Sequence, residues 1–293
     1  MEHQYNIKNN CPLCDHIESK HFISANDHNV SYDSFNITEC IECGLKFTNP
    51  RIKEEKIGDY YKSEDYISHS NTNKGLINKL YHLVRNYQIK QKEKLISKIC
   101  ENKTLLDIGC GTGDFINYCK GKKWSVSGLE PDKKARSYAE NNFKLNVYPG
   151  LKSIKNNTVD VVTMWHSLEH IYNLKDDLNS ISQLINKNGH LIVAVPNSDS
   201  YDAKYYKTFW AAYDLPIHLY HFNKKNIYDI AKAFGFTVIK IKPLIFDSFY
   251  ISMLSERKKN GSVFKGIILG LISNINAIKT TNHSSLIYIL RKN

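Results

Sequence analysis

The chain has 293 residues, of which 42% are hydrophobic and 12% aromatic, a composition typical of globular proteins and unlike that of disordered ones. The length exceeds the roughly 100 to 200 residues of one domain, so we expect one full core and a smaller module. Lysine and arginine exceed aspartate and glutamate by 40 − 29 = 11. This excess allows nucleic acid, an anionic glycan or a membrane surface as a partner, and charge alone selects none of them.

The sequence shows no targeting signal. Its first ten residues lack the basic start and apolar core of a secretion signal, and the longest apolar run, near Gly266 to Ile272, is shorter than the ~20 residues that a membrane span needs. We therefore expect a cytoplasmic protein without a transmembrane segment, for which peripheral contact with a membrane stays open.

Four cysteines near the amino terminus have the spacing of a metal site. Cys11 and Cys14 form one C-x2-C pair, and Cys40 and Cys43 form a second. Two such pairs can close a tetrahedral thiolate site, and disulfides are disfavoured in the cytoplasm. We predict a structural zinc ion in a zinc-ribbon-like module, residues 1–60, since four thiolates leave no position for a reacting water.

Residues 61–100 are predicted to form a helical linker, because apolar side chains recur there every three or four positions. From residue 104 onward, strand and helix patterns alternate. Alternation of this kind predicts an α/β fold with a doubly wound, Rossmann-like parallel sheet and a ligand at the carboxyl ends of the strands. The expected strands are residues 104–108, 125–129, 146–148, 159–165, 190–195, 236–241 and 285–290. The expected helices between them are residues 114–120, 133–141, 152–155, 175–185 and 226–234.

The sequence LLDIGCGTG, residues 105–113, joins the first of these strands to a helix. Its glycines let the backbone approach a ligand closely, and Glu130, at the end of the next strand, is placed to accept hydrogen bonds from both hydroxyls of a ribose. A dinucleotide fingerprint would have a third glycine where this chain has Asp114, whose charge would repel a pyrophosphate. Asp107 and Asp114 instead suit a ligand with cationic groups.

These residues resemble the first motif of the class I S-adenosylmethionine-dependent methyltransferases, and WHSLEH (residues 165–170) and NGHLIVAVPN (residues 188–197) resemble that family's fourth and fifth strands, particularly in bacterial enzymes that act on small molecules and glycans. The resemblance implies a seven-stranded methyltransferase domain over residues 101–293, S-adenosylmethionine as cofactor and a lid formed by the helical linker. A similar zinc-binding segment precedes this domain in several sugar and natural-product methyltransferases.

The resemblance also implies which residues hold the cofactor. Gly150 and Leu151 fall where the family binds the adenine ring, and Trp165 and His166 end the fourth strand. The full cofactor-binding set is Asp107, Gly109, Cys110, Gly111, Gly113, Glu130, Pro131, Gly150, Leu151, Trp165 and His166.

Two insertions interrupt the domain, at residues 198–223 and 246–280. The first is rich in aromatic residues and carries His218 and His221 in the sequence PIHLYHF, which resembles a P-x-H-L-x-H-F run of the same bacterial group. An acceptor hydroxyl needs a base, so His218, His221 and His166 are the candidate catalytic residues, with anchoring of the loop as the structural alternative. The second insertion contains an apolar helix, expected to pack on the domain or to meet a membrane or an apolar acceptor.

The sequence therefore predicts a methyltransferase, acting by O-methylation on a hydroxyl of a small molecule or glycan. Two alternatives stay open. An RNA methyltransferase would agree with the positive charge and the zinc module, and a non-catalytic scaffold would bind S-adenosylmethionine without transferring its methyl group.

Overall fold

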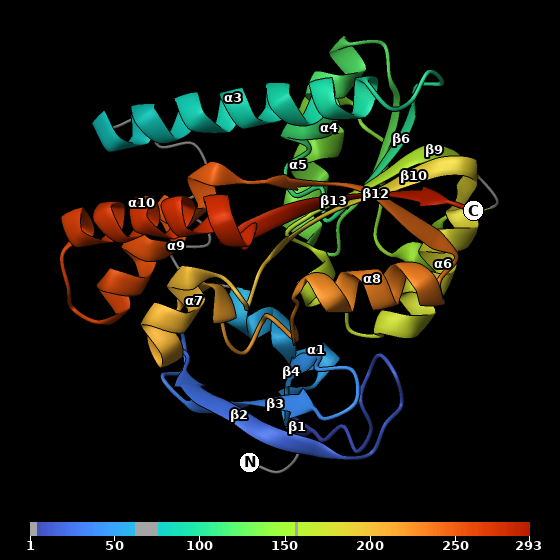
Figure 1. Ribbon diagram of the computed structural model, residues 1–293. Coiled ribbons are helices and arrows are strands. Elements are labelled where there is room, and N and C mark those ends of the chain that lie inside the picture. Colours follow the sequence, from blue (N-terminus) through green and yellow to red (C-terminus); the bar gives the residue numbers. More distant parts are fainter. Residues whose placement is uncertain (1–4, 62–75, 156–157) are drawn as a thin grey trace.

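The computed structural model describes residues 5–61, 76–155 and 158–293, and gives side-chain surroundings from residue 84 onward in the helix that begins at Leu76. Residues 62–75 of the predicted linker therefore lie outside the described residues. The rest of the linker is a single helix, α3 (Leu76–Ser97), which runs past α4 (Asp114–Gly121) on one side of the main sheet (Figure 1).

The main sheet has seven strands in the order β12-β13-β10-β9-β6-β7-β8, and only β13 runs antiparallel to its neighbours. The predicted seven-stranded, doubly wound fold is confirmed. The strands are β6 (Thr104–Ile108), β7 (Ser125–Leu129), β8 (Val147–Tyr148), β9 (Val159–Trp165), β10 (Ile185–Pro196), β12 (Phe236–Pro243) and β13 (Ser285–Lys292). Ile108 is level with Leu129 and with Met164, so the carboxyl ends of β6, β7 and β9 meet at one edge.

Side chains of the central strands alternate between two buried layers, because successive residues of a strand point to opposite faces. Leu105, Val161 and Ile192 pack toward α3 and α4, whereas Leu106, Val162 and Val193 pack toward the other face. The helices that flank the sheet include α5 (Lys133–Phe143), α6 (Leu174–Leu184) and α8 (Lys224–Ala233). The predicted helix at residues 152–155 is a single 3-10 turn, η3 (Leu151–Ser153).

The amino-terminal module is a second, four-stranded sheet in the order β11-β4-β3-β2. Its members are β2 (Ser19–Asn26), β3 (Ser34–Cys40), β4 (Lys46–Thr48) and β11 (Tyr220–His221), beside the short pair β1 (Tyr5–Asn6) and β5 (Arg51–Ile52) and the turns α1 (Glu54–Ile57) and η2 (Gly58–Tyr61). Strand β11 comes from the first insertion and pairs with β4. The module is therefore joined to the main domain by a shared sheet.

The first insertion, which is rich in aromatic residues, is folded and buries most of its large rings. The segment folds into α7 (Tyr201–Tyr206), η5 (Lys207–Phe209), η6 (Ala211–Tyr213) and β11. Tyr206, Trp210 and Tyr213 are buried in a core shared with the amino-terminal sheet and the second insertion, whereas Tyr205 is exposed. These rings hold the three parts together and are not free to stack on a sugar.

The second insertion forms a helical hairpin, α9 (Ile245–Lys258) and α10 (Val263–Thr280), at one end of the molecule (Figure 1). The two helices approach closely at Gly266 and Gly270, where an added Cβ would lie 2.6 Å from the Cα of Met253 and 2.7 Å from the Cα of Phe249. Within the described residues, α10 is also the one helix long and apolar enough to cross a membrane by length and composition, although the apolar run in the sequence predicted no span. The face of α10 that carries Gly266 and Gly270 packs on α9. Peripheral contact with a membrane stays a prediction.

Candidate functional site

The loop between β6 and α4 forms the floor of a pocket at the carboxyl edge of the sheet. Gly109, Gly111 and Gly113 all have positive φ angles, of 75°, 55° and 82°. A Cβ on Gly109 would lie 2.7 Å from the Cβ of Ser167, and one on Gly113 would lie 2.7 Å from Cδ1 of Leu145. Glycine is needed at these two positions because the backbone is packed against neighbouring segments. An added Cβ on Gly111 would meet nothing within 4 Å, so the backbone there is open to a ligand.

Glu130 fixes the geometry of this loop. Its Oε2 accepts a hydrogen bond of 2.9 Å from the backbone N–H of Gly111, and its Oε1 accepts one of 2.9 Å from the backbone N–H of Asp132. Each carboxylate oxygen has a further lone pair, so the group can still accept hydrogen bonds from ribose hydroxyls. Pro131 follows it and leads to Asp132, the N-cap of α5, whose side chain accepts from the N–H of Ala135.

The pocket is lined by the loop, by the end of β9 and by one face of α3. Its lining residues are Arg85, Gln88, Ile89, Lys92, Asp107, Gly109, Cys110, Gly111, Thr112, Asp114, Phe115 and Trp165. Five of the predicted cofactor residues are among them: Asp107, Gly109, Cys110, Gly111 and Trp165. Gly113, Glu130, Pro131, Gly150, Leu151 and His166 are outside this lining, and their part in cofactor binding stays a prediction.

The four lining residues of α3 were not predicted. Arg85 donates a 2.6 Å ion-paired hydrogen bond to Asp114, and the ammonium of Lys92 lies 4.5 Å from the ring centre of Trp165. The spacing of apolar residues in α3 predicted an amphipathic helix, and it does not indicate what the charged residues of that helix contact. Their role depends on how α3 lies across the sheet, which the spacing does not determine.

Asp107 carries the main electrostatic feature of the pocket. Its side chain is buried and accepts a 2.6 Å hydrogen bond from the hydroxyl of Thr163. Burial raises the pKa of Asp107 to about 7, although Thr163 and the charge of Lys92 act in the opposite direction. A buried carboxyl that ionises near neutrality is stabilised as an anion by any further cation in the pocket. This pocket therefore suits a ligand that carries a positive charge.

The three candidate catalytic histidines occupy different surroundings. His166 follows β9 with φ of 55°, its Nε2 lies 3.0 Å from Oδ2 of Asp247, and its Nδ1 lies 3.4 Å from Oε1 of Glu169. Burial alone would lower the pKa of His166, but these two carboxylates outweigh burial and raise the pKa to about 10. An imidazole already protonated at neutral pH donates hydrogen bonds and cannot act as a base.

His221 is buried in the amino-terminal sheet, which favours the structural alternative over its predicted catalytic role. It lies in β11, opposite Lys46 of β4, with its Nε2 3.3 Å from the hydroxyl of Thr48. Its ring is buried against Tyr213, and burial lowers its pKa well below the usual value. His221 anchors the insertion to the amino-terminal sheet, which is the structural alternative weighed for this motif.

His218 belongs to a cluster beside the pocket. One ring nitrogen each from His170 and His218 and one carboxylate oxygen of Glu169 all lie within 4.8 Å of one another. Glu169 and His170 belong to η4 (Leu168–His170), and Ser167, just before it, packs on Gly109 and donates a 2.7 Å hydrogen bond to the carbonyl of Ile108. The cluster is thus attached directly to the loop between β6 and α4.

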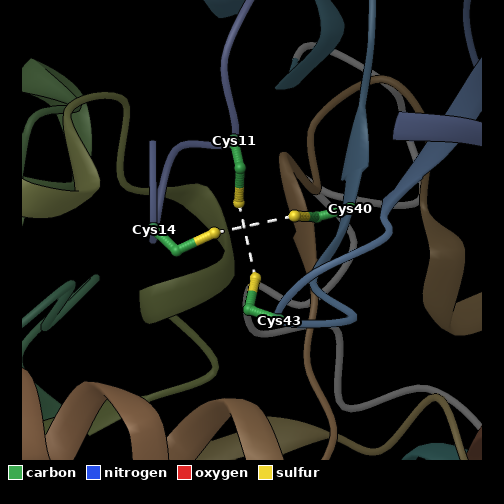
Figure 2. A group of neighbouring side chains, drawn as sticks. All are labelled: Cys11, Cys14, Cys40 and Cys43. Carbon is green, nitrogen blue, oxygen red and sulfur yellow. Dashed lines mark hydrogen bonds between the residues drawn. The ribbon is translucent and has the colours of Figure 1, made fainter. Parts of the chain in front are cut away.

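The predicted metal ligands of the amino-terminal module also converge. Figure 2 shows the side chains of Cys11, Cys14, Cys40 and Cys43 pointing toward a common centre. The sulfurs of Cys11 and Cys43 are 3.5 Å apart, and those of Cys14 and Cys40 are 3.6 Å apart. A tetrahedral ion with metal–sulfur bonds of about 2.3 Å would place its ligands about 3.8 Å apart, so the four thiols fit such an ion.

The electrostatics of the four thiols agree with a cation at their centre. The close sulfur of Cys11 and burial raise the pKa of the Cys43 thiol far above its usual value. A divalent cation between the sulfurs would reverse this effect, because metal-bound thiols are deprotonated. The site is also tied to the main domain, since the Cys43 carbonyl accepts hydrogen bonds of 3.2 Å from Lys225 and from Asn226 of α8.

Comparison with known proteins agrees with this geometry. A family model described as a methyltransferase domain matches residues 81–241, more than half of the chain, and the chain belongs to this family. The predicted membership of the S-adenosylmethionine-dependent methyltransferases is thereby confirmed.

A putative methyltransferase of Invertebrate iridescent virus 6, 235L, is 30% identical over 102 residues, which is 33% of this chain and only 38% of that relative. Magnesium protoporphyrin IX methyltransferase from Synechocystis PCC 6803 is similar in fold. With bound S-adenosylhomocysteine it has a TM-score of 0.56, at 12% identity over 82% of this chain and all of that one. With bound S-adenosylmethionine the TM-score is 0.52, at 13% identity over 84% of this chain and all of that one.

Proposed function

We propose that this protein transfers the methyl group of S-adenosylmethionine to a hydroxyl of a small molecule or glycan. The observation that carries the proposal is the pocket that joins the open Gly111 backbone to the buried Asp107 carboxyl, with Glu130 behind the loop. S-adenosylmethionine supplies an electrophilic methyl group on a sulfonium. Asp107 would attract its cationic portion, and Glu130 would bind its ribose.

The acceptor would lie between the end of β9 and the second insertion. His166 bridges these elements through Asp247 of α9 and Glu169 of η4. As an imidazolium it has two N–H groups, which face these two carboxylates, so it would hold the wall of the acceptor site in place and would not bind the acceptor itself. His218, next to Glu169, is the remaining candidate catalytic histidine near this position.

We also propose that the four cysteines bind zinc and that this ion is structural. A site made of four thiolates is closed, because no ligand position remains for water or substrate. The sulfur distances and the convergence of the four side chains support the ion.

The direct test is transfer of labelled methyl from S-adenosylmethionine into a cell extract separated into small molecules, glycans, lipids, protein and RNA. We expect label in the small-molecule or glycan fraction and none with an Asp107→Ala variant. Label in RNA alone, with binding that weakens steeply as salt rises, would instead support the alternative that the charge of +11 suggests. Binding of S-adenosylhomocysteine without transfer to any fraction would identify a scaffold.

The affinity for S-adenosylhomocysteine should depend on pH through Asp107. Its pKa of about 7 in the free protein means that the carboxylate is mostly ionised above pH 7 and mostly neutral below it. The ligand's ammonium group favours the ionised form of Asp107, so the ligand should bind most tightly above pH 7 and more weakly as the pH falls. The affinity should drop by about tenfold between pH 8 and pH 6. Glu130, whose pKa burial also raises, adds to the fall at lower pH.

Calorimetry at several pH values measures this dependence directly. An Asp107→Asn variant should bind weakly throughout and lose the change between pH 8 and pH 6. If the wild-type affinity is the same at both values, the ligand does not interact with an ionising Asp107.

A further inference from the structure

We infer that Glu169, His170 and His218 form a second metal site, which binds a divalent transition-metal ion beside the cofactor pocket. The inference deepens the proposed function and rests on it, because the ion would lie where the acceptor is expected. Two imidazoles and one carboxylate suit zinc, manganese, iron(II) or cobalt(II), and they leave positions open for other ligands. The site differs in donor set and position from the four cysteines.

The first argument is the state of Glu169. Its side chain is only 1% exposed, and neither carboxylate oxygen has a hydrogen-bond partner among the residues that the structure describes. The only cationic group paired with it there is His166, whose Nδ1 is 3.4 Å from Oε1. A buried carboxylate without hydrogen bonds is costly, because burial removes the water that would otherwise solvate it. A bound cation would supply the missing partner.

The second argument is the orientation of the two imidazoles. Nδ1 of His218 lies 2.9 Å from the carbonyl of Ala212, and Nδ1 of His170 lies 3.2 Å from the carbonyl of Ile217. Only a protonated nitrogen can donate to a carbonyl, so a neutral His218 has its free lone pair on Nε2. Nδ1 of His170 also lies 3.0 Å from the hydroxyl of Tyr61, so either nitrogen of that ring can carry the proton. Metal-binding histidines are held in this way, with one nitrogen bonded to a backbone carbonyl and the other facing the ion.

A further acidic group lies beside the three ligands. Asp214 adds a second carboxylate, with Oδ2 3.9 Å from Nε2 of His218.

Two parts of the chain, far apart in sequence, hold the cluster together. The N–H of Leu219 donates a 2.8 Å hydrogen bond to the carbonyl of Glu169, and the rings of His170 and His218 meet edge to face at 4.6 Å. The ligands are therefore fixed before an ion arrives. An ion here would be a Lewis acid for an acceptor hydroxyl, whose pKa it would lower, and His218 would serve as a ligand instead of a base.

The test measures metal uptake by the full-length protein whose four-cysteine site is already filled with zinc. After a mild chelator removes weakly held ions, Mn²⁺ is added and the free ion is followed by electron paramagnetic resonance. We expect about one Mn²⁺ per chain in the wild type. Binding should weaken at least about a hundredfold in Glu169→Gln and in His218→Gln, since loss of even an outer partner commonly costs ten- to a hundredfold.

The matched control is His221→Gln, a change in another buried histidine of the same segment, which should keep the Mn²⁺ affinity. Affinity for S-adenosylhomocysteine, measured on every variant, shows that the main domain is folded. No Mn²⁺ uptake by the wild type, or equal uptake by folded Glu169→Gln and His218→Gln variants, would overturn the inference. Absence of methyl transfer, with metal uptake intact, would count against the proposed function alone.

Discussion

Replacing Cys40 with serine should release the zinc ion and unfold the amino-terminal module. Binding of a structural zinc ion contributes about 10 to 16 kcal/mol in small zinc-finger peptides, more than the few kcal/mol that the core of a module this small supplies. Cys40 ends β3, and its carbonyl accepts the 3.0 Å hydrogen bond from Gly44 that shapes the second cysteine pair. Loss of one ligand therefore removes both the ion and the turn that it holds.

Metal analysis together with hydrogen exchange tests this prediction. The wild type should hold about one strongly bound zinc ion, and Cys40→Ser should lose it while amides of β2, β3, β4 and β11 exchange faster. Cys100→Ser is the control, because Cys100 lies outside the cluster and its Sγ only donates to the Asn102 carbonyl. A folded, reduced wild-type protein without metal would contradict the prediction.

Replacing Gly113 with valine should abolish cofactor binding and lower the melting temperature. Gly113 has φ of 82°, and a Cβ there would lie 2.7 Å from Leu145 and 2.9 Å from Ala139. The left-handed conformation costs a β-branched residue about 1 to 2 kcal/mol, and overpacking adds about 1 to 3 kcal/mol. The loop would have to move away from α5, and the hydrogen bond between Gly111 and Glu130 would be lost.

Calorimetry with S-adenosylhomocysteine and thermal unfolding measure the two effects. Gly121→Ala is the matched control, since an added Cβ at Gly121 meets nothing within 4 Å and its φ angle is ordinary. That variant should bind and melt as the wild type does. Wild-type affinity in Gly113→Val would show that the loop tolerates a side chain and that cofactor binding does not depend on its close packing against α5.

The parts of the fold that could be predicted from the sequence are those set by local pattern. The strand β6, the glycine loop and Glu130 are close in sequence, and each has a residue type that a tight strand-to-helix turn requires. The order of strands and helices could be predicted from the alternation of strand and helix patterns after residue 104, because parallel strands need helical crossovers. The convergence of the four cysteines could be predicted because the ligand pairs have a regular spacing.

Features set by long-range packing could not be predicted in this way. Lys92 and Arg85 line the pocket only because α3 lies across the loop. Strand β11 has two residues, too few for a periodic pattern, and its pairing with β4 joins segments some 170 residues apart. An aromatic residue in a loop can be buried or exposed, and the sequence does not distinguish the two cases. The burial of Trp210 and Tyr213 in a shared core could therefore not be predicted.

The pairing of β11 with β4 affects how the protein is made. Translation proceeds at about 5 to 20 residues per second, so β4 leaves the ribosome roughly 10 to 30 seconds before β11 is synthesised. During that interval Phe47, which is buried in the finished protein, has no strand β11 beside it. The edge of β4 is then open to pairing with other chains, and early metal loading would be the means by which the nascent module stays folded until its last strand arrives.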